Sequence, residues 1–145
     1  MIRLNNEIEA LQISFFSEII LDILSRHEEL SLIKVSLFAY LIKSNRSNIY
    51  RIYNGKTSND LVYKAVSLLS GEYQTFCKSM PYILKAVHLL ISIQKISEEN
   101  QILKVCKSDI NKISIFKENS FIDKAIEASK KMSNKQFTKE IINCV

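Results

Sequence analysis

The sequence predicts a mainly α-helical domain with one small β-hairpin, at about residues 101–117, and helices at its C-terminal end. Only two glycines and one proline occur in 145 residues, which favours long helices over a sandwich rich in turns. Apolar residues recur at helical spacing through most of the chain, but the period changes to two near residue 103. A helix that runs into a hairpin is the closing half of a winged-helix unit, so we expect a winged-helix-like domain.

The chain is expected to form one domain, residues 1–145. Its length is sufficient for one hydrophobic core, and its 47% hydrophobic and 24% charged residues are typical of a globular protein. The N-terminus lacks the layout of a signal peptide, and the most apolar window, 82–93, is too short to span a bilayer. We therefore expect a cytoplasmic protein without membrane contact, in which Cys77, Cys106 and Cys144 are reduced thiols.

The first two helices are expected at residues 6–26 and within the segment LSLIKVSLFAYLI. In the first, apolar residues from Ile8 and Leu11 onwards form one stripe, interpreted as the face that meets the core. The second is apolar nearly all round and must be central, and Ser31 can cap its start. Residues 43–60 are rich in Asn and Ser and are interpreted as a loop.

A third helix is expected to begin at Asn59 or Asp60 and to continue past Gly71 to Cys77 with a bend. Pro81 would lie in the first turn of a fourth helix, where its missing N–H costs nothing. That helix would extend towards residue 96 and lead to a polar break, SEENQ. After the hairpin, residues 120–145 should form two helices, the second capped by Ser133 or Asn134.

The hairpin is expected from two short apolar segments, ILKVC and KISIF, joined by KSDIN. Within each segment apolar residues alternate with polar ones, which is the pattern of a half-buried strand. Two strands alone are marginally stable, so the apolar face must close this chain's own core or meet a partner. The residues assigned to this docking face are Leu103, Val105, Ile113, Ile115 and Phe116.

Catalytic and metal-binding patterns are not recognisable in the sequence. His27 and His88 are far apart, and His88 falls within an apolar helix, where a histidine is usually a core residue. No cysteine–histidine cluster predicts a zinc site, and Gly55-Lys56-Thr57 lacks the upstream glycine of a phosphate-binding loop. We therefore expect neither catalysis nor a cofactor.

A net charge of +5 permits contact with nucleic acid without requiring it. Basic residues alternate with tyrosines in the loop between the second and third helices, where cations can contact phosphates and tyrosines can stack. A solvated loop is the simpler interpretation, because a single basic patch is weak evidence. The candidates for nucleic-acid contact are Arg46, Tyr50, Arg51, Tyr53 and Lys56 in this loop and Lys104, Lys107 and Lys112 on the hairpin.

The order of segments resembles the middle components of three-component ABC systems, which include Lamassu-type anti-phage defence operons. The resemblance covers NNEIEALQ, the apolar LSLIKVSLFAYLI, the basic NRSNIYRI, PYILKAVHLLISIQKI with the hairpin, and the closing AIEASKKMSNKQFTKEIINCV. The sequence departs from that pattern at Lys43-Ser44, where the family has a proline, and at Asn143-Cys144-Val145, where Leu-Gly-Val is common. It also contains no tryptophan, which the family often has in its closing section.

The resemblance implies a small non-catalytic adaptor between an SMC-like ABC ATPase and an effector, often a nuclease. Such a complex senses phage or plasmid DNA, and the adaptor can contact double-stranded DNA directly or through its partners. The residues alone leave an alternative open, a winged-helix DNA-binding transcriptional regulator, because of the net charge and the basic loop. A small helical enzyme is the least favoured class, because no catalytic pattern supports it.

Overall fold

The computed structural model describes residues 2–44, 58–106 and 120–143. The predicted class is confirmed, because the described chain is mainly helical with one small antiparallel sheet. The elements are α1 (Ile2–His27), β1 (Glu29–Ser31), α2 (Leu32–Ser44), α3 (Ser58–Ser67), α4 (Tyr73–Ser92), β2 (Ile96–Glu99), β3 (Ile102–Val105), α5 (Ser120–Ser129) and α6 (Asn134–Asn143).

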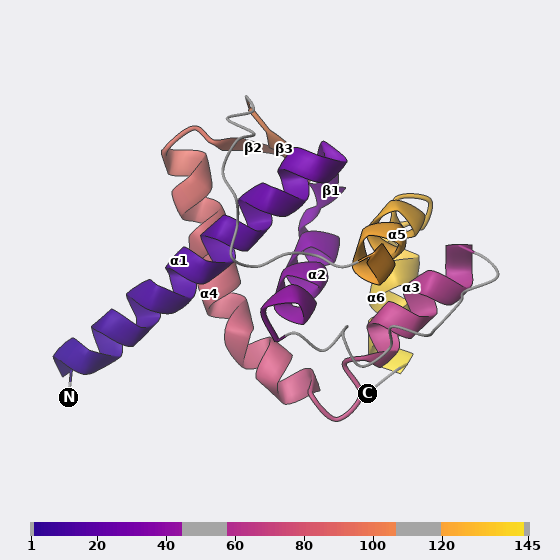
Figure 1. Ribbon diagram of the computed structural model, residues 1–145, viewed down its shortest axis with the longest axis horizontal. Coiled ribbons are helices and arrows are strands. Elements are labelled where there is room, and N and C mark those ends of the chain that lie inside the picture. Colours follow the sequence, from indigo (N-terminus) through magenta and orange to yellow (C-terminus); the bar gives the residue numbers. More distant parts are fainter. Residues whose placement is uncertain (1, 45–57, 107–119, 144–145) are drawn as a thin grey trace.

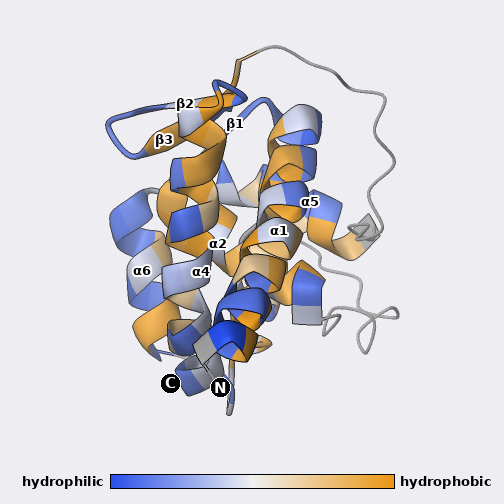
Figure 2. Ribbon diagram, turned by 90° about the vertical axis from the view of Figure 1, so that its left-hand side faces the viewer, coloured by the Kyte–Doolittle hydropathy of each residue, from blue (hydrophilic) through white to orange (hydrophobic). Residues whose placement is uncertain are grey.

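Helix α2 lies at the centre of the fold, as its apolar sequence predicts. Every residue from Lys34 to Ile42 is buried, including Lys34 and Ser36. Figure 1 shows α1 and α4 on one side of α2 and the helices α3, α5 and α6 on the other. Hydrophilic and hydrophobic residues alternate along the surrounding helices (Figure 2), and the buried apolar residues of these helices form the core. The core is therefore built from the two groups of helices around α2.

The sheet has the strand order β1-β3-β2, and both pairs are antiparallel. Strand β1 was not predicted, because three residues are too few to display a period of two. It lies directly after α1, and Leu30 pairs with Leu103 of β3. Both leucines are buried, so the sheet adds its apolar face to the helical core.

The hairpin comprises residues 96–105, so the predicted boundaries of 101–117 are wrong. Its turn is Asn100-Gln101, and both residues have positive φ, as a type I′ turn requires. The side chain of Glu98 accepts a hydrogen bond from the Gln101 N–H at 2.8 Å. The segment interpreted as a polar break thus contains most of β2 and the turn. Because only Ile96 of β2 is buried, this strand carries little alternation for a sequence pattern to reveal.

Strand β3 lies within the predicted segment ILKVC, residues 102–106, and ends one residue before it. Its neighbours on the two sides are β1 and β2. The partner strand predicted at 112–116 lies outside the described residues. The hairpin partner of β3 therefore precedes it in the sequence instead of following it.

The predicted boundary between the third and fourth helices is also wrong. Helix α3 ends at Ser67, and α4 begins at Tyr73, well before Pro81. The bend expected near Gly71 is a break, because Gly71 has φ +79, which an L-residue with a side chain rarely adopts. Pro81 consequently lies inside α4 and not in its first turn.

Helix α4 ends earlier than predicted. Its last residue is Ser92, and Gln94 has φ 62. The N–H of Lys95 donates to the carbonyl of Leu90 at 2.9 Å, which matches the longer bond of a Schellman-type helix end. This reversal of the chain delivers Ile96 into β2 and to the core.

The C-terminal pair of helices is confirmed. Ser133 caps α6, as predicted, because its hydroxyl accepts a hydrogen bond from the Gln136 N–H at 3.1 Å. Phe137 of α6 is fully buried, and its ring lies 6.1 Å from that of Phe38 in α2. Among the described residues, no helix has both the length and the apolar character needed to cross a membrane.

Candidate docking surface

The N-terminal half of α1 exposes a row of large apolar side chains. Leu4, Ile8 and Leu11 are 55%, 48% and 51% exposed. Their spacing of four and three residues places them on one face of the helix, and we call this row the N-terminal stripe. In Figure 1 this end of α1 extends beyond α4 and away from the rest of the molecule.

The sequence pattern assigned Ile8 and Leu11 to the core, and that prediction is wrong. The buried part of α1 begins at Phe16 and includes Ile19 and Ile23. Within the first half, Glu9 of α1 forms an ion pair with Lys85 of α4, which holds the two helices together at their surface. A period of 3.6 residues indicates that one face of a helix is apolar, but it does not indicate whether that face is covered by the rest of the chain.

The docking face predicted on the hairpin belongs to the core where it can be described. Leu103 is fully buried, and Val105 is partly buried against the core. Leu103 is therefore not accessible to a partner. Ile113, Ile115 and Phe116 lie outside the described residues.

Most of the candidates for nucleic-acid contact also lie outside the described residues, namely the loop from Arg46 to Lys56 together with Lys107 and Lys112. Lys104 is exposed on β3, where its register partners are Glu29 on β1 and Ser97 on β2. Strand β2 adds Glu98 and Glu99, both exposed. The described part of the hairpin therefore mixes both signs of charge.

His27 connects the end of α1 to α5. The imidazole is buried, with Nδ1 3.2 Å from Oε1 of Glu127 and Nε2 3.4 Å from Oδ1 of Asp123. Lys130 lies beside them: its Nζ donates to the His27 carbonyl at 2.5 Å and is 3.3 Å from Oε2 of Glu127. The sequence could not reveal this cluster, because His27 and its carboxylate partners are far apart in the chain.

Glu127 is held in its charged form by this cluster. Burial of the carboxyl alone would raise its pKa, but the hydrogen bonds with His27 and Lys130 and the charges of both outweigh that effect, so the pKa of Glu127 is below its usual value. A carboxylate with a depressed folded pKa stabilises the protein above its unfolded pKa and loses this contribution as the pH falls through the folded value.

We expect Glu127→Gln to lower the free energy of unfolding at pH 7 by at most about 1 kcal/mol, because the Glu127 side chain is 53% exposed and water screens its charge. The difference from the wild type should persist down to the usual carboxyl pKa of about 4.5 and shrink below it. Urea unfolding at a series of pH values measures this. The exposed Glu99→Gln is the control, and a Glu127→Gln effect that grew below pH 4 would contradict the assignment.

The remaining chemistry of the described surface is sparse. His88, predicted to be in the core, is exposed on α4. Cys77 and Cys106 are exposed free thiols. No group of three His, Cys, Asp or Glu side chains that could hold a metal ion occurs within residues 2–44, 58–106 and 120–143.

Comparison with known proteins adds no relative. No protein-family model, curated protein or solved structure matches the chain.

Proposed function

We propose that the chain is a non-catalytic adaptor subunit of a bacterial anti-phage or anti-plasmid defence complex, linking an SMC-like ABC ATPase to an effector nuclease. The N-terminal stripe is the observation that carries this proposal. The stripe presents three large apolar side chains at helical spacing on the N-terminal half of α1, which extends away from the rest of the molecule. Such a face suits docking against a helix of a partner. An SMC-like ATPase, which is built around long helices, is a partner of this chemistry.

The order of the elements supports a winged-helix-like adaptor. A winged-helix domain has a helix, a strand, two helices and a hairpin, with the last strand in the middle of the sheet. Here α1, β1, α2, α4, β2 and β3 follow that order, with α3 as an additional helix, and β3 is the central strand. Winged-helix subunits of SMC complexes dock on their partners through helix and hairpin faces.

The charges of the described hairpin favour the adaptor over a DNA-binding regulator. Non-specific affinity for DNA comes from cations that neutralise phosphates. Between Ile96 and Val105 the exposed charged residues are Glu98, Glu99 and Lys104, which is an excess of acid. On α4, the ammonium group of Lys85 is already paired with Glu9.

Co-expression with the neighbouring genes tests the proposal. The tagged wild-type chain should co-purify with an SMC-like ATPase encoded beside it, whereas the variant Leu4→Ser/Ile8→Ser/Leu11→Ser should lose this partner. Circular dichroism should show equal helicity for both, because the three side chains are about half exposed and contribute little to the core. Ile142→Ser, at an apolar position of α6 that is 61% exposed, is the matched control and should retain the partner.

Two outcomes would contradict the proposal. A wild-type chain that remains alone in the presence of both neighbouring gene products would not be an adaptor. Retention of the ATPase by the triple variant would exclude the N-terminal stripe as the docking site. A mobility shift of duplex DNA by the isolated chain, weakening steeply with salt, would instead favour the regulator.

A further inference from the structure

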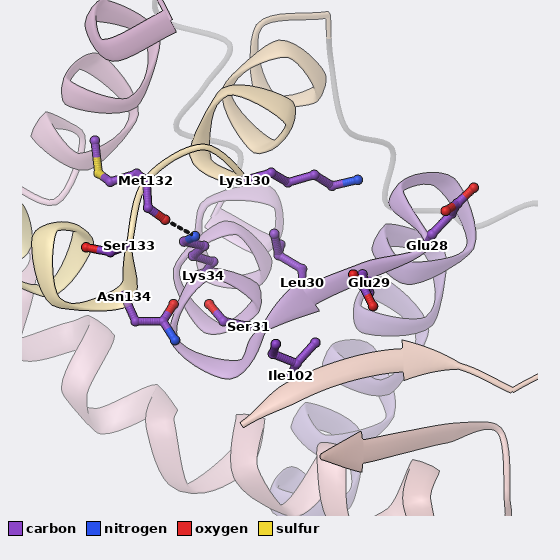
Figure 3. A pocket seen from close by; sticks show the side chains of 10 residues that line it. All are labelled: Glu28, Glu29, Leu30, Ser31, Lys34, Ile102, Lys130, Met132, Ser133 and Asn134. Carbon is purple, nitrogen blue, oxygen red and sulfur yellow. Dashed lines mark hydrogen bonds between the residues drawn. The ribbon is translucent and has the colours of Figure 1, made fainter. Parts of the chain in front are cut away.

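A cavity of about 360 Å³ lies between the sheet, the start of α2 and the link from α5 to α6. Leu30 and Ile102 form an apolar wall, and Ser31, Lys34 and Asn134 form a polar end (Figure 3). Small-molecule sites in proteins begin at about this volume and combine an apolar lining with a few polar groups. The cavity therefore has the size and the composition of a small-ligand site.

Lys34 is a buried cation without a counter-ion. Its side chain is only 5% exposed, and its ammonium donates to the Met132 carbonyl at 2.5 Å. An ammonium has three N–H donors, so one carbonyl does not satisfy it. Within the described part of the chain, no carboxylate lies within ion-pair distance of Lys34. Burial accordingly lowers the pKa of Lys34, because the charged form is poorly solvated.

Ser31 is the second unsatisfied group at this end of the cavity. Its hydroxyl was predicted to cap α2, but among the described residues it has no hydrogen-bond partner although it is buried. Buried hydroxyls usually have a partner, because an unmade hydrogen bond is costly. In Figure 3 the hydroxyl points to the side of the cavity where Lys34 and Asn134 lie.

The backbone adds positive potential to the same end. Helix α2 begins directly after Ser31, and α6 begins at Asn134. A helix N-terminus carries a partial positive charge. Two helix N-termini, one buried ammonium and one free hydroxyl thus converge where an anion would fit, whereas Glu28 and Glu29 lie across the cavity from Lys34 (Figure 3).

We propose that this cavity binds a small organic monocarboxylate. One carboxylate would neutralise Lys34 and accept a hydrogen bond from Ser31, so that the ammonium gains a counter-ion and the hydroxyl gains a hydrogen-bond partner. A dianion such as phosphate would bring an additional negative charge opposite Glu28 and Glu29. Leu30 and Ile102 would cover a short alkyl body. The proposal concerns this chain alone and is independent of the adaptor function.

Titration of the full ¹⁵N-labelled chain at constant ionic strength tests it, with sodium butyrate as the probe. We expect saturable shifts of the backbone amides in residues 30–34 and 132–134. Butyramide has the same shape without the charge, and inorganic phosphate has the charge without the alkyl body. Butyramide should bind at least about fivefold more weakly than butyrate, because charge-assisted hydrogen bonds are stronger than neutral ones. Phosphate should also bind at least about fivefold more weakly, because it leaves the apolar wall uncovered and adds negative charge opposite Glu28 and Glu29. Shifts that do not saturate, or equal binding of butyramide, would overturn the proposal.

Two substitutions locate the site. Lys34→Met keeps an unbranched side chain that is one atom shorter and removes the charge, and it should weaken butyrate binding by at least about tenfold. Lys131→Met makes the same change at an exposed position of the α5–α6 link and should leave binding unchanged. If Lys34→Met does not fold, Ser31→Ala tests the other group and should weaken binding about threefold. Unchanged affinity in the folded variants would place the ligand elsewhere and refute the assignment.

Discussion

Replacing Phe137 with alanine is expected to lower the free energy of unfolding by about 3–5 kcal/mol, which is the usual cost of removing a buried phenyl ring. The Phe137 side chain is fully buried, and its contact with Phe38 holds α6 against the central helix α2. Truncation removes apolar contact and leaves a cavity between α6 and α2. Urea unfolding followed by circular dichroism measures the change as a lower midpoint.

Ile142→Ala is the matched control for this substitution. It removes an apolar side chain from the same helix, but Ile142 is 61% exposed. Its effect should remain within about 0.5 kcal/mol of zero, as for most surface changes. A loss smaller than about 1 kcal/mol for Phe137→Ala would contradict the packing of α6 on α2.

Pro81→Ala is expected to raise the free energy of unfolding by about 1–2 kcal/mol. A proline inside a helix has no N–H to donate to the carbonyl four residues earlier, here that of Cys77, and its ring crowds that carbonyl, which costs about 3 kcal/mol. Part of the gain is offset because alanine gives the unfolded chain more freedom. Pro81 is exposed, so little packing is lost. The same urea unfolding experiment reports the change.

Gln74→Ala, at an exposed position near the start of α4, controls for the general effect of alanine on this helix and should change stability by a few tenths of a kcal/mol. Helix α4 is curved in Figure 1, and proline is a common cause of curvature. If Pro81→Ala were destabilising, the curvature would be required for the packing of α4 against α1. The expectation that Pro81 merely interrupts the hydrogen-bond ladder would then be wrong.

Strong local patterns predicted much of the fold. The apolar segment from Leu32 to Ile42 required a central position, and α2 occupies it. Phe121, Ala125 and Ala128 at helical spacing predicted the first C-terminal helix, and Phe137 and Ile141 predicted the second. Ser133, one of two candidates, caps the second helix. These predictions succeed because the residues on which each depends lie within one or two helical turns of each other.

Features that depend on distant residues were not predictable. Strand β1 pairs with β3, where Leu30 lies opposite Leu103. Its three residues are too few to show the apolar–polar alternation that predicts a strand. The turn Asn100-Gln101 lacks the glycine that marks most two-residue hairpins, so the hairpin was placed too late. The cluster around His27 and the cavity beside Lys34 both join the N-terminal half of the chain to the α5–α6 region.

The placement of β3 between its two neighbours has a consequence for self-association. A strand with open edges is a template on which other chains can add, and a long apolar edge promotes aggregation. In this sheet the outer strands are β1, which has three residues, and β2, which exposes Glu98 and Glu99. The apolar strand is thus enclosed, and the outer edges are either very short or acidic. The described edges of this sheet are therefore poor templates for edge-to-edge pairing between copies of the chain.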